Sequence, residues 1–119
     1  MSDGKRRFLF VCHAAMNRSP TAEGVCREIA RANGLDIDAS SAGISRAAER
    51  PVTKELADRA DRIFVMEPEM EAILKKEFGQ KPDKIICLDI PDIYATWDPL
   101  LVKRLEDSLY EFFAREGLL

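Results

Sequence analysis

The stretch from residue 8 to residue 20 reads FLFVCHAAMNRSP and passes from an apolar run through a short loop to a helix start. The run from Phe8 to Val11 does not alternate with polar residues, which is typical of a parallel strand that is covered on both faces. Cys12 ends this run. Ser19 is a favoured helix N-cap, and Pro20 suits the first helical position. Strand, loop and helix in this order indicate an α/β unit.

The rest of the chain repeats the alternation of strand and helix. Further strands are expected over residues 35–41, 63–66 and 85–88, and further helices over residues 53–60 and 68–78 and from residue 98 onward. The last helix is expected to bury Leu101, Val102, Leu105, Leu109, Phe112 and Phe113. We therefore predict an α/β fold with three layers, in which helices cover both faces of a small four-stranded parallel sheet.

The chain has 119 residues, a formal charge of −3, 46% apolar residues and 33% charged residues. This length and balance are typical of one globular domain, so residues 1–119 are expected to form a single domain. The longest apolar run is too short to cross a bilayer, and no signal-peptide core follows the basic residues near the start. We therefore expect a cytoplasmic protein without a membrane partner. The mildly acidic charge argues against a nucleic-acid partner.

Chemistry is expected where the strands end, since ligands of open α/β sheets bind beyond the carboxyl ends of the strands. Cys12 lies at such an end, six residues before Arg18. The N–H groups of the loop between them can converge on one anion, and Arg18 can bind two phosphate oxygens. The helix start and the guanidinium favour a thiolate at Cys12, which would attack a bound phosphorus atom. The intervening anion-binding residues are His13, Ala14, Ala15, Met16 and Asn17. The alternative is a cysteine that is only buried, beside a solvated arginine.

These residues resemble a known family. Residues 10–23 are similar to the phosphate loop of the low-molecular-weight protein tyrosine phosphatases, and Ser41-Ala42-Gly43, Met66-Glu67 and residues 90–94 match that family in the same order. The resemblance extends from residue 8 to about residue 113 and is strongest to a short bacterial branch of predicted tyrosine phosphatases. One departure is that Ala14-Ala15 stands where the family has Gly-Asn.

The resemblance implies roles for several residues. Cys12 would form a phosphocysteine intermediate, Arg18 would bind the equatorial oxygens of the transferred group, and Ser19 would donate a hydrogen bond to the Cys12 sulfur. Tyr94 would contact the substrate. Trp97 is expected to pack beneath the last helix.

Expulsion of an alkoxide or phenoxide needs a proton donor, and two aspartates follow the fourth strand at a suitable distance. Asp98 precedes Pro99 and is explained by helix capping. Asp92 has no helix to cap and matches the family's acid, so we favour Asp92. Asp98 remains the alternative, with Asp89 a weaker third candidate.

The sequence therefore predicts a cysteine-dependent phosphatase that hydrolyses phosphate monoesters, with phosphotyrosine the expected ester. Its partners would be phosphorylated proteins or small phosphate esters, and phosphate or other oxyanions would bind the loop. No metal ligand set is apparent, and no cofactor is expected. One alternative is a non-catalytic phosphate-binding or phosphoprotein-binding module, suggested by Ala14-Ala15. A weaker one is arsenate reduction, which needs resolving thiols, and after the third strand only Cys87 is available. Cys26 and Cys87 are expected to be core residues.

Overall fold

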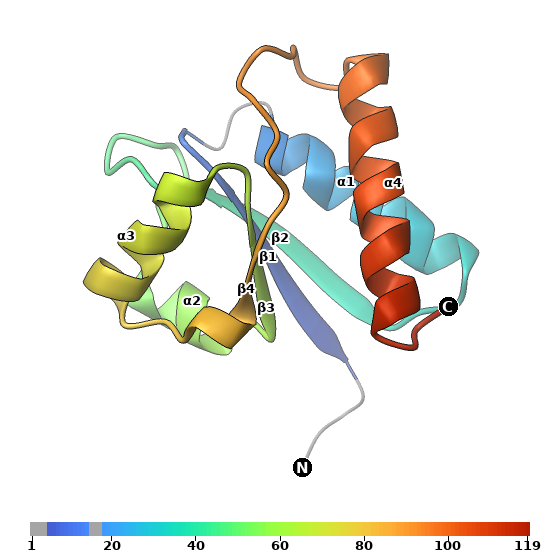
Figure 1. Ribbon diagram of the computed structural model, residues 1–119, viewed down its shortest axis with the longest axis horizontal. Coiled ribbons are helices and arrows are strands. Elements are labelled where there is room, and N and C mark those ends of the chain that lie inside the picture. The colour runs from blue at the N-terminus through green and yellow to red at the C-terminus, as the bar shows by residue number, and fades with distance from the viewer. Residues whose placement is uncertain (1–4, 15–17) are drawn as a thin grey trace.

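The computed structural model describes residues 5–14 and 18–119 and contains one four-stranded parallel sheet of order β2-β1-β3-β4. The strands are β1 (Arg6–Cys12), β2 (Ile37–Gly43), β3 (Arg62–Val65) and β4 (Ile85–Cys87). α1 (Arg18–Ala32) and α4 (Pro99–Arg115) cover one face of this sheet, and α2 (Lys54–Arg59) and α3 (Pro68–Phe78) cover the other (Figure 1). A single 3-10 turn, Pro82–Lys84, precedes β4. The predicted α/β fold with helices on both faces is confirmed.

A cluster of phenylalanines joins the sheet to the last helix. Phe10 of β1 stacks on Phe64 of β3 at a centroid distance of 4.8 Å, and Phe112 of α4 meets the edge of Phe64 at 5.0 Å. Phe8 of β1 contacts Phe64 of β3 and both Phe112 and Phe113 of α4. Large aromatic side chains supply much apolar burial in a chain of this size. This cluster fixes α4, and with it the loop that precedes α4, against the sheet.

The helix ends mostly follow the expected signals. The Thr53 hydroxyl accepts a hydrogen bond from the Leu56 N–H, and Asp98 accepts one from the Leu100 N–H. Gly79, at the end of α3, has a left-handed backbone with a φ of 64°. One expectation was wrong: α1 begins at Arg18, so Ser19 lies in its first turn rather than at the N-cap. The Ser19 hydroxyl contacts the Cys12 sulfur, as expected.

Two smaller expectations also need correction. Val102 is only partly covered, because it lies at the margin of the apolar face of α4, while the other five predicted core residues of that helix are buried. β2 begins at Ile37 and not at residue 35, because its pairing with β1 starts where Ile37 lies opposite Arg6.

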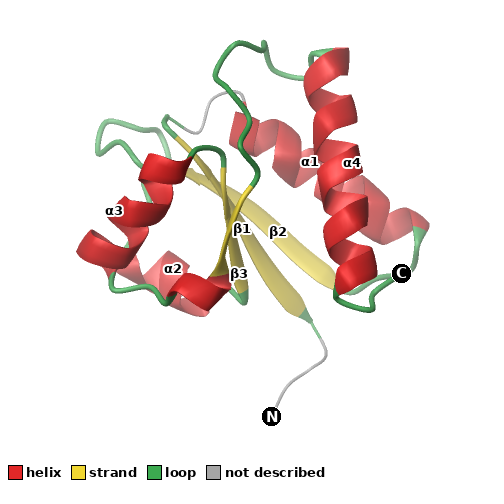
Figure 2. Cartoon of the chain, in the orientation of Figure 1, coloured by secondary structure: helices red, strands yellow, loops and turns green. Residues whose placement is uncertain are grey.

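The topology brings several chain segments to one edge of the sheet (Figure 2). β1 and β3 are neighbours, but β1 leads to α1 on one face and β3 leads to α3 on the other. In open α/β sheets, ligands bind beyond the carboxyl ends of two strands that diverge in this way. Cys12 lies at the carboxyl end of β1, opposite Gly43 at the end of β2, so it stands at this end of the sheet.

Within residues 5–14 and 18–119, no helix combines the length and the apolar character needed to cross a membrane.

Candidate active site

Cys12 lies at the carboxyl end of β1 and is 3% exposed. Its Sγ is 3.0 Å from Ser19 Oγ, and Ser19 Oγ is in turn 3.5 Å from the carbonyl oxygen of Ala42. A thiol at Cys12 can donate to Ser19, which then donates to Ala42. A thiolate can instead accept the Ser19 hydroxyl proton, and hydrogen bonds to charged acceptors are the stronger ones. The pair is therefore suited to both protonation states of the sulfur.

The loop after Cys12, residues 12–18, is called the phosphate loop here. The carbonyl of Cys12 accepts a hydrogen bond from the Ile44 N–H at 2.8 Å, and the carbonyl of His13 accepts one from the Ser45 N–H at 2.9 Å. These bonds extend the pairing of β1 and β2 beyond the sheet and hold the base of the loop at Cys12 and His13. Ala15, Met16 and Asn17 lie outside the described residues.

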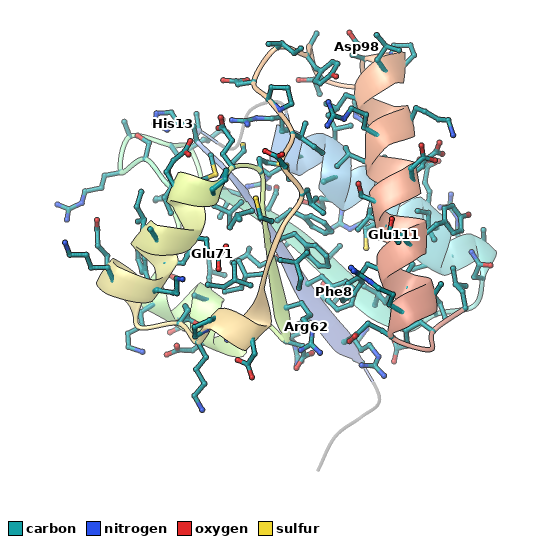
Figure 3. The ribbon with its side chains drawn as sticks, in the orientation of Figure 1. Phe8, His13, Arg62, Glu71, Asp98 and Glu111 are labelled. Atoms are coloured by element: carbon teal, nitrogen blue, oxygen red, sulfur yellow. The ribbon has the colours of Figure 1, made fainter. Side chains whose placement is uncertain are left out.

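His13 is exposed and Ala14 is partly buried. Figure 3 places His13 at the end of the molecule where β1 terminates, as it does Asp98, whereas Arg62 lies toward the opposite end. The side chain of His13 therefore lies at the same end of the molecule as the carboxyl ends of the strands.

Arg18 is 2% exposed although it carries a charge. Its Nη1 donates to Glu67 Oε1 at 2.9 Å and to the carbonyl oxygen of Ile90 at 2.8 Å, and its Nε lies 3.7 Å from Asp92 Oδ1. A buried charge is costly unless it is paired, and the two carboxylates offset that cost. Arg18 thus joins the start of α1 to the end of β3 and to the loop after β4.

Glu67 is a site residue to which the sequence reasoning gave no role of its own. It directly follows β3 and stands at the N-cap of α3, yet its side chain makes no capping hydrogen bond. The Glu67 carboxylate instead accepts a hydrogen bond from Arg18. Its position at the carboxyl end of a buried strand was the one available signal.

The loop between β4 and α4, residues 89–98, carries the two candidate acids and is called the acid loop here. The Asp92 side chain is 61% exposed, and the contact found for it is with Arg18. Asp98 caps α4 through its Oδ1. Tyr94 is partly buried, and its hydroxyl oxygen lies 3.4 Å from Arg104 Nη1. Of these side chains, Asp92 is the one in contact with Arg18.

Trp97 does not lie beneath the last helix as expected. The residue is 45% exposed, and its ring packs over Gly24 of α1. The glycine leaves room for the ring, because a Cβ at residue 24 would come within 2.5 Å of Trp97 Cζ2.

Ser41 near the end of β2 serves α1. Its hydroxyl donates to Glu23 Oε1 at 2.7 Å and accepts from Arg50, and Glu23 also pairs with Arg27 at 2.7 Å. These contacts hold α1 against β2, so the role of Ser41 is structural.

Cys26 differs sharply from Cys12 in its surroundings. It is fully buried in α1, and burial raises the pKa of its thiol to about 12. Because alkylation requires the thiolate, Cys26 should resist iodoacetamide at neutral pH until the protein is unfolded. Peptide mapping after labelling with and without denaturant measures this. Labelling of Cys26 in the native protein as fast as in the unfolded protein would contradict its placement in the core.

Comparison with known proteins identifies the relatives of this chain. The family model of the low molecular weight phosphotyrosine protein phosphatases matches residues 7–96. A curated protein-arginine-phosphatase from Bacillus subtilis (strain 168) is 28% identical over 102 residues, which cover 67% of this chain and 68% of that protein.

Solved structures show the same fold. The low molecular weight protein tyrosine phosphatase SP-PTP from Streptococcus pyogenes superposes with a TM-score of 0.77 at 18% identity, covering 92% of each chain. The tyrosine phosphatase Wzb from Escherichia coli K30, solved in complex with phosphate, gives a TM-score of 0.74 at 20% identity, covering 92% of this chain and 96% of that one.

Proposed function

Because the chain belongs to the low molecular weight phosphotyrosine protein phosphatase family, we propose that it hydrolyses phosphate monoesters through a phosphocysteine at Cys12, with phosphotyrosine as its substrate. The observation that carries this proposal is the contact of 3.0 Å between Cys12 Sγ and Ser19 Oγ at the start of the helix that also bears the buried Arg18. A nucleophile, a hydrogen-bond donor for it and a fixed cation thereby share one helix start.

In the first step the Cys12 thiolate attacks the phosphorus atom. A P–S bond forms while the bond between phosphorus and the ester oxygen breaks, and Asp92 gives its proton to that oxygen. The Ser19 hydroxyl donates to the sulfur before the attack. The products of this step are the phosphocysteine and the free alcohol or phenol.

In the second step water attacks the phosphocysteine. The Asp92 carboxylate, now without its proton, accepts a proton from the water, whose oxygen bonds to phosphorus as the P–S bond breaks. The departing thiolate again accepts the hydrogen bond of Ser19. Inorganic phosphate leaves, and both Cys12 and Asp92 return to their starting states.

Arg18 would stabilise the charge on the transferred group. Glu67 and the carbonyl of Ile90 hold the guanidinium through Nη1, which leaves the edge of Nε and Nη2 for two phosphate oxygens. A fixed donor pair stabilises a transition state without reorganising as the reaction proceeds. Since Asp92 lies 3.7 Å from Nε, a phosphate bound at this edge would place Asp92 beside the leaving oxygen.

A second candidate substrate is phosphoarginine, because the curated relative that is 28% identical is a protein-arginine-phosphatase. The two substrates differ in the bond that breaks, which is P–O in phosphotyrosine and P–N in phosphoarginine. Both reactions use the same nucleophile and the same arginine.

Two peptides of one sequence, carrying phosphotyrosine or phosphoarginine at the same position, distinguish these candidates. We expect phosphate release from the phosphotyrosine peptide, undiminished by a metal chelator, with the larger kcat/KM. A larger kcat/KM for the phosphoarginine peptide would overturn the assignment of phosphotyrosine. Binding of phosphate without turnover of either peptide would overturn the enzymatic proposal and favour a binding module.

Replacing Asp92 with asparagine tests the assignment of the acid. The amide cannot donate a proton to the leaving oxygen, so kcat on a phosphotyrosine peptide should fall by about 10²–10⁴-fold. An aryl phosphate with an acidic phenol needs less protonation, and its loss should be smaller.

The matched control is Asp98→Asn, since asparagine is an equally good helix N-cap. This variant should keep both its stability and its kcat. A large loss in Asp98→Asn together with a small loss in Asp92→Asn would reverse the assignment.

A further inference from the structure

The acid loop is attached to the rest of the molecule at its beginning through Ile90. This residue is fully buried, its N–H donates to the carbonyl of Met66 at 2.8 Å, and its own carbonyl accepts from Arg18 Nη1 at 2.8 Å. The first residues of the loop are therefore tied to the end of β3 and to the first residue of α1.

The end of the acid loop is attached to the same helix through Trp97. The backbone N–H of Trp97 donates to the hydroxyl oxygen of Thr21 at 3.1 Å, and Thr21 is fully buried in α1. One turn further along, the Trp97 ring lies on Gly24. In Figure 1 the loop between β4 and α4 arches past the N-terminal end of α1, which agrees with these contacts.

The backbone is strained at Asp89, which directly precedes Ile90, and at Trp97. Asp89 and Trp97, with φ values of 55° and 61°, are the two non-glycine residues with a positive φ within residues 5–14 and 18–119. Such conformations persist only where the surroundings hold them, and they cluster at functional sites. Burial is a weak explanation for the conformation of Trp97, because the residue remains 45% exposed.

Between these attachments Tyr94 packs against the core, but the residues around Asp92 are exposed. Asp92 is 61% exposed at its side chain and Ile93 is 74% exposed. The Asp92 carboxylate is therefore held by its contact of 3.7 Å with Arg18 and by the attachments of the loop on either side of it. We propose that Trp97 is a positioning residue, which acts through its contacts with Thr21 and Gly24 to hold Asp92 beside Arg18. This inference rests on the function proposed above. It adds to that reaction a residue that positions the acid without itself contacting the reacting atoms.

Gly24→Ala is the sharpest test of the contact between Trp97 and Gly24. Alanine favours a helix more than glycine does, so α1 itself should not be weakened. The new Cβ would lie 2.5 Å from Cζ2 and 2.7 Å from Cη2 of Trp97, and the exposed ring is the group able to move away. Trp97 is the single tryptophan of the chain, so its fluorescence reports the displacement directly.

We expect the Trp97 emission of Gly24→Ala to shift to longer wavelength. We also expect kcat on a phosphotyrosine peptide to fall about tenfold or more, because small displacements of a catalytic group are costly. KM should change little, and an aryl phosphate with an acidic phenol should be affected less, since it depends less on Asp92. In a Trp97→Leu background, which removes the ring, Gly24→Ala should cause little further loss.

Two results would overturn the inference while leaving the proposed function intact. One is an active wild type whose Gly24→Ala variant shifts the emission but keeps its kcat on the phosphotyrosine peptide. The other is an unchanged emission in Gly24→Ala, which would show that the Trp97 ring does not pack on residue 24. A wild type without turnover would overturn the proposed function, and the positioning role with it.

Discussion

Cys12→Ser is expected to lower the turnover of an aryl phosphate by at least about 10⁴-fold, to the background of the assay. A serine hydroxyl is largely protonated at neutral pH, and Ser19 provides a hydrogen bond but no general base. The substituted hydroxyl is also smaller than the sulfur, so the anion site should still bind phosphate. Steady-state kinetics with a chelator present measures the loss, and calorimetric titration with phosphate shows that the site persists.

The matched control is Cys87→Ser. Cys87 lies at the end of β4, is partly buried, and has a thiol whose pKa is raised by that burial. It should keep near wild-type turnover, with no thiol reductant required. Comparable activity in Cys12→Ser and wild type would remove Cys12 from the mechanism, and dependence of turnover on Cys87 would point to thiol exchange instead.

Arg18→Lys is expected to lower kcat/KM by about 10³-fold even though the charge is kept. The guanidinium is 2% exposed, and one of its nitrogens already serves both Glu67 and the carbonyl of Ile90. An ammonium has no second edge, so it cannot satisfy these acceptors and at the same time bind two phosphate oxygens. Because the interaction is strongest in the transition state, kcat should fall together with kcat/KM.

Arg115→Lys provides the control for this substitution. Arg115 is exposed at the end of α4 and pairs loosely with Glu111, so its replacement should leave the kinetics unchanged. Thermal unfolding in the presence and absence of phosphate separates folding from binding, since a ligand that binds the native state raises Tm. A folded Arg18→Lys variant that retains kcat/KM within tenfold of wild type would contradict the role of the guanidinium in binding two phosphate oxygens.

Local sequence was sufficient for most of the secondary structure. The unbroken apolar run from Phe8 to Val11 and the caps at Thr53, Asp98 and Gly79 each act within a few residues, so propensity and periodicity predicted them. Ser19 was misplaced because a serine beside a proline satisfies the capping pattern equally well one position into the helix. Its contact with the Cys12 sulfur, which the family resemblance implied, depends on how strand and helix meet.

The contacts that build the site join residues far apart in the chain. Glu67 lies 49 residues from Arg18, and Trp97 lies 76 residues from Thr21. No periodicity or cap links such pairs; they follow from the strand order β2-β1-β3-β4 and from the path of the acid loop. The sequence therefore predicted Cys12, Arg18 and Asp92 as site residues, but it did not predict the residues that hold Arg18 and the acid loop in place.

The most direct test of the account is to trap the phosphoryl group on the enzyme. Wild type and Asp92→Asn are mixed rapidly with an aryl phosphate, denatured within the first turnovers and digested for mass spectrometry of the peptide that contains Cys12. We expect one phosphoryl group on Cys12, with a larger amount in Asp92→Asn because water then lacks its general base. Active enzyme in which this peptide never carries a phosphoryl group, or carries it on another residue, would contradict the mechanism.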